Sequence, residues 1–303
     1  MAITAAKKLA DFNGFIKPEL AAPIFDEAAK GSAAMSLIRK VPLGASGQAF
    51  PVVTSRPTAN WTAEGTKKHT TEAGLGLVKM KPEKLTAIAV ASQEVIRANP
   101  GSYSETLQAL LAEAFARAFD LAVFHNKGGD GNGTSPFETT LAATTKTLTL
   151  GATAGTNTYD DIVKAMSLNL QGVPKKKVTG FAFDTGFEID LLTTKDTTGK
   201  PLFAEAAYTG AVPALRAGSV LGRPSFIHEN VGNDKTVGFA GDWSKCAWGT
   251  VGGIAMDIST EATVTIGGQL VSLYENNLVA VRAEAEYGFT VADKDAFVKI
   301  TRK

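Results

Sequence analysis

The chain has 303 residues, of which 44% are hydrophobic and 20% are charged, and its formal net charge is +1 at pH 7. These values are ordinary for a globular protein and argue against a dedicated nucleic-acid binder, which usually carries a strongly basic face. No run of about eighteen apolar residues is present, so we expect no membrane-spanning helix. The only cysteine is Cys246, which excludes an internal disulfide and is expected to be a small buried residue.

The first 45 residues predict an arm with short helical pieces. In the segment 17–30, Pro18 stands near the start and Gly31 follows the end, as at the two ends of many helices. Apolar residues are sparse in this segment, so it cannot form a core alone. We therefore expect the arm to pack on another part of the protein.

Residues 46–91 predict extended structure. Val78 and Met80 alternate with lysines, which is the period of a strand with one wet face, and residues 85–91 are nearly all apolar or small, as in a buried strand. About 25 polar and small residues separate the two extended arms, and compact domains seldom carry so long a loop without a function. The sequence therefore predicts a long hairpin with a task of its own.

Trp61 lies in this loop, within the sequence ANWTAEGTKKH (residues 59–69). One interpretation is that Trp61 folds back onto its own domain. The other is that it anchors a contact with another chain, where tryptophan is enriched. The residues alone leave both open.

A long helix over residues 102–127 is the strongest prediction. Ser102 and Glu105 have the spacing of a capping box, apolar residues follow at helical spacing, and two glycines after residue 127 end the pattern. A shorter helix with Ser92 as its cap precedes it. Beyond residue 157 we expect helices at 158–170 and after Asp184, with strands at 178–183, 236–240, 247–251, 254–258, 270–274, 279–285 and 296–300.

The residues indicate no active site. His69, His125 and His228 lie far apart and match no metal motif, and neither a nucleophile elbow nor a phosphate-binding loop is present. Asp130-Gly131-Asn132-Gly133 lacks the ligand spacing of a calcium loop and predicts a tight turn. We therefore expect no cofactor, no metal and no enzyme.

The order of these features resembles a known family. A hairpin with Trp61-Thr62-Ala63-Glu64-Gly65 precedes the run 85–96, the long helix with residues 110–120, an α+β region, and the closing segments 279–284 and 296–300. This order, over nearly the whole chain, resembles the major capsid proteins of tailed bacteriophages of the Hong Kong 97 type. The resemblance implies an α+β, Hong Kong 97-like capsid fold. Its expected parts are an N-terminal arm (1–45), an extended loop hairpin (46–91), a peripheral domain (92–154) with a spine helix (102–127), an axial domain (155–270), and C-terminal strands (271–303) that return to both domains.

The resemblance also implies a function and partners. The chain would be a structural, self-assembling subunit of an icosahedral head, forming pentamers and hexamers that enclose DNA. It would reside in the virion, be assembled in the host cytoplasm, and meet a separate scaffolding protein, a portal and, by non-specific contact, packaged DNA, but no membrane. Lys7, Lys8, Arg39 and Lys40, or Lys175-Lys176-Lys177, could face the DNA; the open alternative is that they are solvated surface residues.

A further implication concerns contacts between subunits. The loop residues Trp61, Glu64, Lys67 and Lys68 are the expected intersubunit contacts. In the founding member of the family, a loop lysine forms an isopeptide bond with an asparagine of another subunit, assisted by a glutamate; the matching residues here are Lys68, Asn277 and Glu284. A neutral amine would attack the carboxamide with loss of ammonia, and a glutamate in apolar surroundings would accept the proton. The alternative is a salt bridge at Lys68, with Asn277 and Glu284 pairing with neighbouring strands.

Two other functions remain open from the sequence. One keeps the fold but packages an enzyme, as in an encapsulin-like compartment shell. The other is a soluble α+β enzyme, against which stands the lack of a convergent acid, base or metal set.

Overall fold

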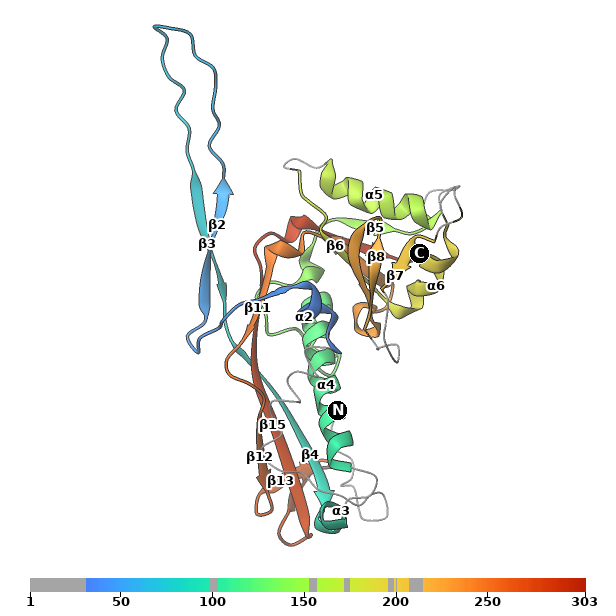
Figure 1. Ribbon diagram of the computed structural model, residues 1–303. Coiled ribbons are helices and arrows are strands. Elements are labelled where there is room, and N and C mark those ends of the chain that lie inside the picture. Colours follow the sequence, from blue (N-terminus) through green and yellow to red (C-terminus); the bar gives the residue numbers. More distant parts are fainter. Residues whose placement is uncertain are drawn as a thin grey trace.

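The computed structural model describes residues 31–98, 103–152, 157–171, 175–195, 199, 201–206 and 215–303. Three parts stand out in Figure 1: a two-stranded hairpin that projects from the molecule, an elongated sheet beside a long helix, and a second sheet flanked by helices. The helix expected over residues 17–30 and the capping box at Ser102 lie outside the described residues.

The first sheet is built around one long central strand, β15 (Leu278–Val291). On one side β15 pairs antiparallel with β4 (Glu83–Ser92), and on the other side with β11 (Cys246–Thr250) and β12 (Ala255–Ser259). The two-residue strand β1 (Arg39–Lys40) extends the sheet by pairing with β11. Alternate residues of β15 face inward and are buried, including Ala283, Ala285, Tyr287, Phe289 and Val291.

Helix α4 (Tyr103–His125) covers the inner face of this sheet. Phe119 is at the centre of the contact, with its ring centroid 5.5 to 6.4 Å from those of Phe137, Trp248, Tyr287 and Phe289. The buried alanines of α4 let the helix approach the sheet closely. Leu110 was expected in the apolar stripe but is 55% exposed, so the stripe is narrower at this end of the helix than predicted.

Two short helices adjoin this layer. In α3 (Gln93–Ala98) the Ser92 hydroxyl accepts a hydrogen bond from the Val95 amide at 3.3 Å, which confirms the predicted cap. Helix α2 (Ala33–Leu37) packs on α4 near its middle. Both helices are too short to be stable without the layer beneath them.

The second sheet has seven strands in the order β5-β16-β10-β6-β9-β8-β7. Helix α5 (Thr158–Leu170) lies against β5, β10 and β16. A hydrophobic core that includes the aromatic side chains of Phe181, Phe183 and Phe187 packs against this sheet. The strands are β5 (Thr147–Thr149), β6 (Gly180–Phe183), β7 (Phe203–Glu205), β8 (Arg216–Val220), β9 (Arg223–Ile227), β10 (Thr236–Gly241) and β16 (Phe297–Thr301).

Local details of this sheet confirm some predictions and correct others. Asp184 caps a single turn, η4 (Thr185–Phe187), which leads into α6 (Glu188–Thr193), as expected. The cap of α5 is Asn157 and not Thr158, because the Asn157 side chain accepts from the Asp160 amide at 2.9 Å. Strands β8 and β9 were not predicted, since neither shows a regular alternation of apolar and polar residues.

The division of the chain between the two sheets does not follow the order of the sequence. β11 and β12 fall within residues 155–270 but pair with the first sheet, whereas β15 and β16, both from residues 271–303, belong to the first and the second sheet. Strand β4, expected at the end of the extended loop, already belongs to the first sheet. The chain therefore passes between the two sheets several times.

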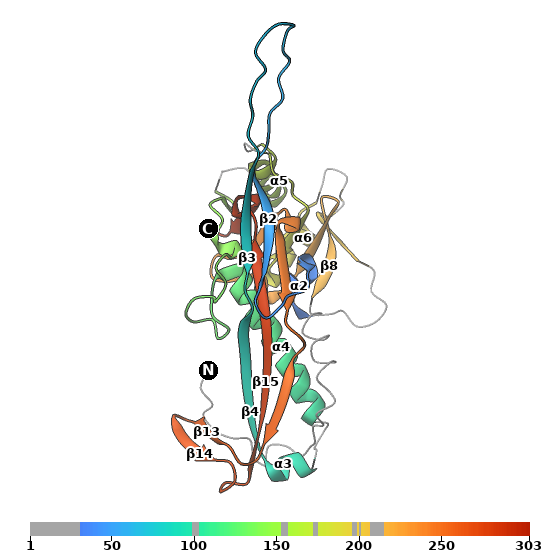
Figure 2. The same cartoon turned by 90° about the vertical axis from the view of Figure 1, so that its left-hand side faces the viewer.

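Two hairpins extend from the first sheet. β2 (Gln48–Ser55) and β3 (Gly74–Met80) form the projecting hairpin, which Figure 2 shows in line with β4 and β15. At the opposite end, β13 (Thr263–Ile266) and β14 (Gln269–Ser272) form a small hairpin that packs on Val90 and Leu278. β13 was not predicted from the sequence.

Candidate intersubunit contact site

The projecting hairpin is solvated over most of its length. Every residue from 53 to 73 is exposed, and no regular structure connects β2 to β3 between residues 56 and 73 except one turn. Few bonds tie this loop together; the Thr58 amide donates to the Thr71 hydroxyl at 2.8 Å and the Thr66 amide to the Ala63 carbonyl at 3.3 Å. A two-stranded hairpin is marginally stable alone in water, so this arrangement points to a partner.

The hairpin carries apolar side chains on both faces. On one face the opposed pairs Pro51–Leu77 and Val53–Leu75 are exposed, with Leu75 at 76% and Leu77 at 68%. On the other face Phe50 opposes Val78. Exposed apolar surface gathered on one element marks a contact site in a protein that is otherwise well packed.

Trp61 lies at the far end of this hairpin and is fully exposed, at 105% of its reference area. This excludes the interpretation that Trp61 folds back onto its own domain. Glu64, Lys67 and Lys68 are exposed in the same loop. The expected contact of these four residues with another subunit stays a prediction.

Asn277 is far from the loop, in the turn just before β15. Its φ of 52° is in the left-handed region, which asparagine tolerates better than most residues. Its carbonyl accepts from the Gln93 amide at 2.9 Å, and its side-chain amide donates to the Glu94 carboxylate. These contacts give Asn277 a structural role at the junction of β15 and α3.

Glu284 lies seven residues beyond Asn277, on β15. At about 3.3 Å per residue along a strand, the two positions are about 23 Å apart. Within one chain Glu284 therefore cannot assist a reaction at Asn277. Its surroundings are also not apolar, because it accepts from Lys84 at 3.0 Å and is 3.5 Å from the Arg282 guanidinium.

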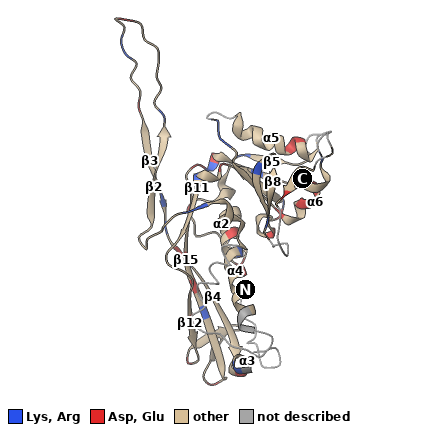
Figure 3. Cartoon of the chain, in the orientation of Figure 1, with Lys and Arg blue, Asp and Glu red and all other residues tan. Residues whose placement is uncertain are grey.

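The outer face of the first sheet, on the side opposite α4, is covered at both ends but not between them. At the end near the projecting hairpin, Leu43 and Met80 cover Gly249 and Gly288. At the other end, the β13–β14 hairpin covers Val90 and Leu278. Between them lie five charged side chains, which we call the charged window: Lys84, Asp257, Arg282, Glu284 and Glu286. Figure 3 shows basic and acidic segments together on this sheet, near β4, β12 and β15.

Electrostatics within the charged window are mixed and slightly acidic, since it holds two basic and three acidic groups. Arg282 donates to Asp257 at 2.6 Å, and this bond, aided by Glu284, raises the pKa of Arg282. Among the described residues, Glu286 alone in the window has no ion pair. This surface was not predicted from the sequence, although polar residues alternate at positions 282, 284 and 286 of an otherwise apolar strand, a pattern that indicates a solvent-facing side.

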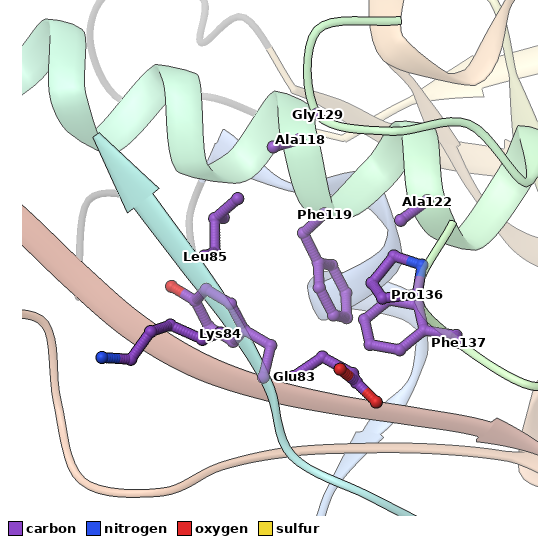
Figure 4. A pocket seen from close by; sticks show the side chains of 10 residues that line it. Glu83, Lys84, Leu85, Ala118, Phe119, Ala122, Gly129, Pro136 and Phe137 are labelled. Atoms are coloured by element: carbon purple, nitrogen blue, oxygen red, sulfur yellow. The ribbon is translucent and has the colours of Figure 1, made fainter. Parts of the chain in front are cut away.

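The two cavities found among the described residues are too small for a substrate. The larger of two described cavities, between β4, α4 and residues 129–137, has a volume of about 50 Å³. Figure 4 shows the rings of Phe119 and Phe137 in it, with Glu83 and Lys84 on the β4 side. Ligand pockets usually measure about 300 Å³ or more, so this cavity has room only for a water molecule or two.

The remaining candidate groups are structural in the residues described. His69 is exposed in the hairpin loop, whereas His125 and His228 are both largely buried. Cys246 is buried, and burial raises the pKa of its thiol, which confirms the prediction of an inert residue. No three metal-binding side chains cluster in the described ranges, and no helix there is long and apolar enough to cross a membrane. Asp130 accepts from the Asn132 amide at 2.9 Å, which confirms the tight turn.

Comparison with known proteins identifies the family. The Phage capsid family matches residues 13–301. The chain belongs to this family. It is 39% identical over 294 residues to the probable major capsid protein gp17 of Mycobacterium phage D29, covering 96% of this chain and 91% of the relative. It is 40% identical to the corresponding protein of Mycobacterium phage L5, covering 96% and 90%.

Solved structures agree on the fold. A chain from Gordonia phage Cozz superimposes with a TM-score of 0.71 at 25% identity, covering 90% of this chain and 86% of that one. A chain from Microbacterium phage Oxtober96 gives a TM-score of 0.70 at 21% identity, with 90% and 91% covered. The Hong Kong 97-like α+β fold is thus confirmed, and the chain is a structural subunit of the phage capsid. These similarities favour neither of the two alternatives considered from the sequence, an encapsulin-like compartment shell and a soluble α+β enzyme.

Proposed function

We propose that this capsid protein forms the pentamers and hexamers of an icosahedral head, and that each subunit lays its β2–β3 hairpin over a neighbour. The observation that carries this is the uninterrupted exposure of residues 53–73, with Trp61 at the far end. Burying a large aromatic side chain and the exposed leucines would supply the favourable energy that the hairpin lacks alone.

The charged window of a neighbouring subunit is the surface that fits the hairpin loop best. The loop 56–73 carries three basic residues and two acidic ones, a net charge of +1 with His69 neutral, whereas the window carries a net charge of −1. Complementary charge of this kind fixes the register of a contact more than its strength. Ile88, 45% exposed beside Arg282, offers an apolar contact within the window.

Lys68 would then form an ion pair and not an isopeptide bond. Its partner would be Glu286, which forms no ion pair among the described residues, or Glu284. Two observations support the ion pair over the crosslink. Glu284 is held between two cations in place of apolar surroundings, and the Asn277 amide is already bound to Glu94.

A denaturing gel of boiled particles tests this choice. Without crosslinks, assembled shells should run as one band near the chain mass of 31.7 kDa. A ladder of multimers that disappears in Lys68→Arg would instead establish a covalent bond at this residue.

Electron microscopy of the purified chain tests the shell itself. We expect closed particles built from pentamers and hexamers, and deletion of residues 57–72 should leave a folded subunit that does not assemble. A protein that stays a monomer or dimer under all assembly conditions would contradict the proposal.

The finer assignments follow the same reasoning. We assign the hairpin to the extended loop, the first sheet with α4 to the peripheral domain, and the second sheet with α5 and α6 to the axial domain around which capsomers form. A separate scaffolding protein, a portal and non-specifically bound DNA would be the other partners, with assembly in the host cytoplasm. Exposed Lys175 and Lys177 are available for DNA, whereas Lys176 is paired with Asp293.

A further inference from the structure

A fully buried carboxylate, Asp120, lies near the C-terminal end of α4. Its oxygens accept from the Ser32 hydroxyl at 2.6 Å and from the amides of Ala33 and Ala34, both at 3.1 Å. Ser32 in turn caps α2 by accepting from the Met35 amide at 3.0 Å. Asp120 therefore fastens the start of α2 to α4.

Asn230 connects this carboxylate to the second sheet. It belongs to η5 (Glu229–Val231), a single turn between β9 and β10. Its side chain hydrogen-bonds to Asp120, its main-chain amide donates to the His228 Nδ1 at 3.2 Å, and its main chain also meets the His125 ring. One turn of the second sheet thus touches three titratable groups, two of which are on α4.

The charged neighbours of these three titratable groups do not cancel the effect of burial on them. In the described part of the chain Asp120 forms no ion pair, and its neighbours from α2 and η5 are uncharged hydrogen-bond donors. His125 faces Phe239 of β10, with Lys127 and Asp234 as its charged neighbours. His228 faces Glu229 of its own turn and Glu113 of α4. Burial penalises the ionised form of each group, and the carboxylates near the two histidines offset this only in part.

We propose that this cluster, Asp120, His125, His228 and Asn230, is a proton-linked junction in which the two attachments to α4 respond to pH in opposite directions. Acid strengthens the attachment of α2 and weakens that of the second sheet. Near neutral pH the balance is reversed, so the two parts can be loosened from α4 separately.

The direction in which pH changes the attachment of α2 to α4 follows from the pKa of Asp120. Burial raises its pKa from 3.8 to about 6, although its hydrogen bonds oppose this. The attached state therefore binds a proton more tightly than the released state, in which Asp120 meets water. This attachment is strongest below pH 3.8 and weakens as the pH rises through 6.

The direction in which pH changes the attachment of the second sheet to α4 follows from the pKa values of the two histidines. Burial lowers the pKa of His125 from 6.5 to about 4, and it also lowers the pKa of His228. The attached state therefore binds protons less tightly than a state in which η5 has left α4. This attachment has its full strength above pH 6.5 and weakens as the pH falls toward 4.

Hydrogen exchange on the full-length chain, at about pH 5 and about pH 7.5, tests the junction. The reporters are the amides of Ser36 and Ile38, bonded within α2, and the amide of Val231, bonded within η5. After correction for intrinsic exchange rates, opening at α2 should increase about tenfold from pH 5 to pH 7.5, as the two Asp120 pKa values require. Opening at η5 should decrease, also on the order of tenfold.

Variants separate the two halves. Asp120→Asn should abolish the pH dependence at α2 and keep that at η5, whereas His125→Gln should reduce only the latter. Asp161→Asn is the matched control, because Asp161 is another buried carboxylate but is paired with Lys164 on α5; both pH dependences should remain. If Asp120→Asn does not fold, Ser32→Ala serves, since losing this donor should move the α2 midpoint above pH 6.

Two results would overturn the proposal. One is wild-type protein whose α2 and η5 reporters change in the same direction by the same factor, which would mean a single global opening. The other is an α2 response that survives in Asp120→Asn.

Discussion

The hairpin adjoins the first sheet in space, but the two regions differ in how far their large side chains are buried. Phe119 of α4 is 2% exposed and touches four aromatic rings, whereas Trp61 of the hairpin is fully exposed and no other ring of the described chain meets it. The first sheet buries its large apolar side chains within its own chain and needs no partner. The extended hairpin leaves its large apolar side chains exposed and does need one. Large aromatic residues thus serve folding in one region and, as we propose, assembly in the other.

The largest expected effect separates these two uses. Phe119→Ala should destabilise the unassembled chain by about 3–5 kcal/mol, because it leaves a cavity among the rings that it contacts. Trp61→Ala removes an aromatic residue of similar size but should change the free energy of unfolding by less than about 0.5 kcal/mol. Urea unfolding of both variants measures the difference, and a comparable loss in Trp61→Ala would contradict the comparison.

The next effect is on assembly. Trp61→Ala together with Leu75→Ser should weaken the contact by about 2 kcal/mol or more, as buried aromatic anchors usually do, and so raise the concentration needed for assembly at least about tenfold. Light scattering against protein concentration measures this. Trp61→Phe with Leu75 intact is the matched control and should assemble nearly as well as the wild type; equal assembly of all three proteins would remove the hairpin from the contact.

A smaller effect lies at the border between the two regions. A Cβ at Gly288 would be 2.7 Å from the Leu43 Cδ2 and 2.9 Å from the Met80 Cγ, where the base of the hairpin crosses β15. Gly288→Ala should therefore destabilise the chain by about 1–3 kcal/mol through overpacking. Gly253→Ala, with nothing within 4 Å of the added atom, is the control. Thermal unfolding that is equal in the two variants would show that this border is not tightly packed.

The smallest effect concerns the proposed ion pair. Lys68→Ala should weaken assembly by less than about 1 kcal/mol, and the loss should vanish at high salt, where exposed charges are screened. Lys68→Glu should be worse, and adding Glu286→Lys should restore part of the loss. If the double exchange gives no recovery at low salt, Glu286 is not the partner of Lys68.

Much of the architecture was predictable because it depends on local patterns. The periodicity of α4, the caps at Ser92 and Asp184, and the strands at 236–240 and 279–285 all use contacts within a few residues or one alternation of faces. The hairpin was predictable from loop length and from the polar composition between two strands. The family resemblance added the fold as a whole.

What could not be predicted depends on contacts between distant segments. The bond from Ser32 to Asp120 joins residues 88 positions apart, and nothing in the sequence around Asp120 distinguishes it from a surface residue. The assignment of β11, β12 and β16 to sheets depends on pairing partners, which alternation does not reveal. The charged window became visible only when β4, β12 and β15 lay side by side.

The position of β15 and β16 in the chain has a consequence for the timing of synthesis. β15 is the central strand of the first sheet and β16 lies between β5 and β10 in the second, yet both are within the last 26 residues, 278–303. Neither sheet can be completed until β15 and β16 have been synthesised. A growing polypeptide that lacks these two strands therefore presents no finished surface to its neighbours, and only chains that contain both become eligible for incorporation into a shell.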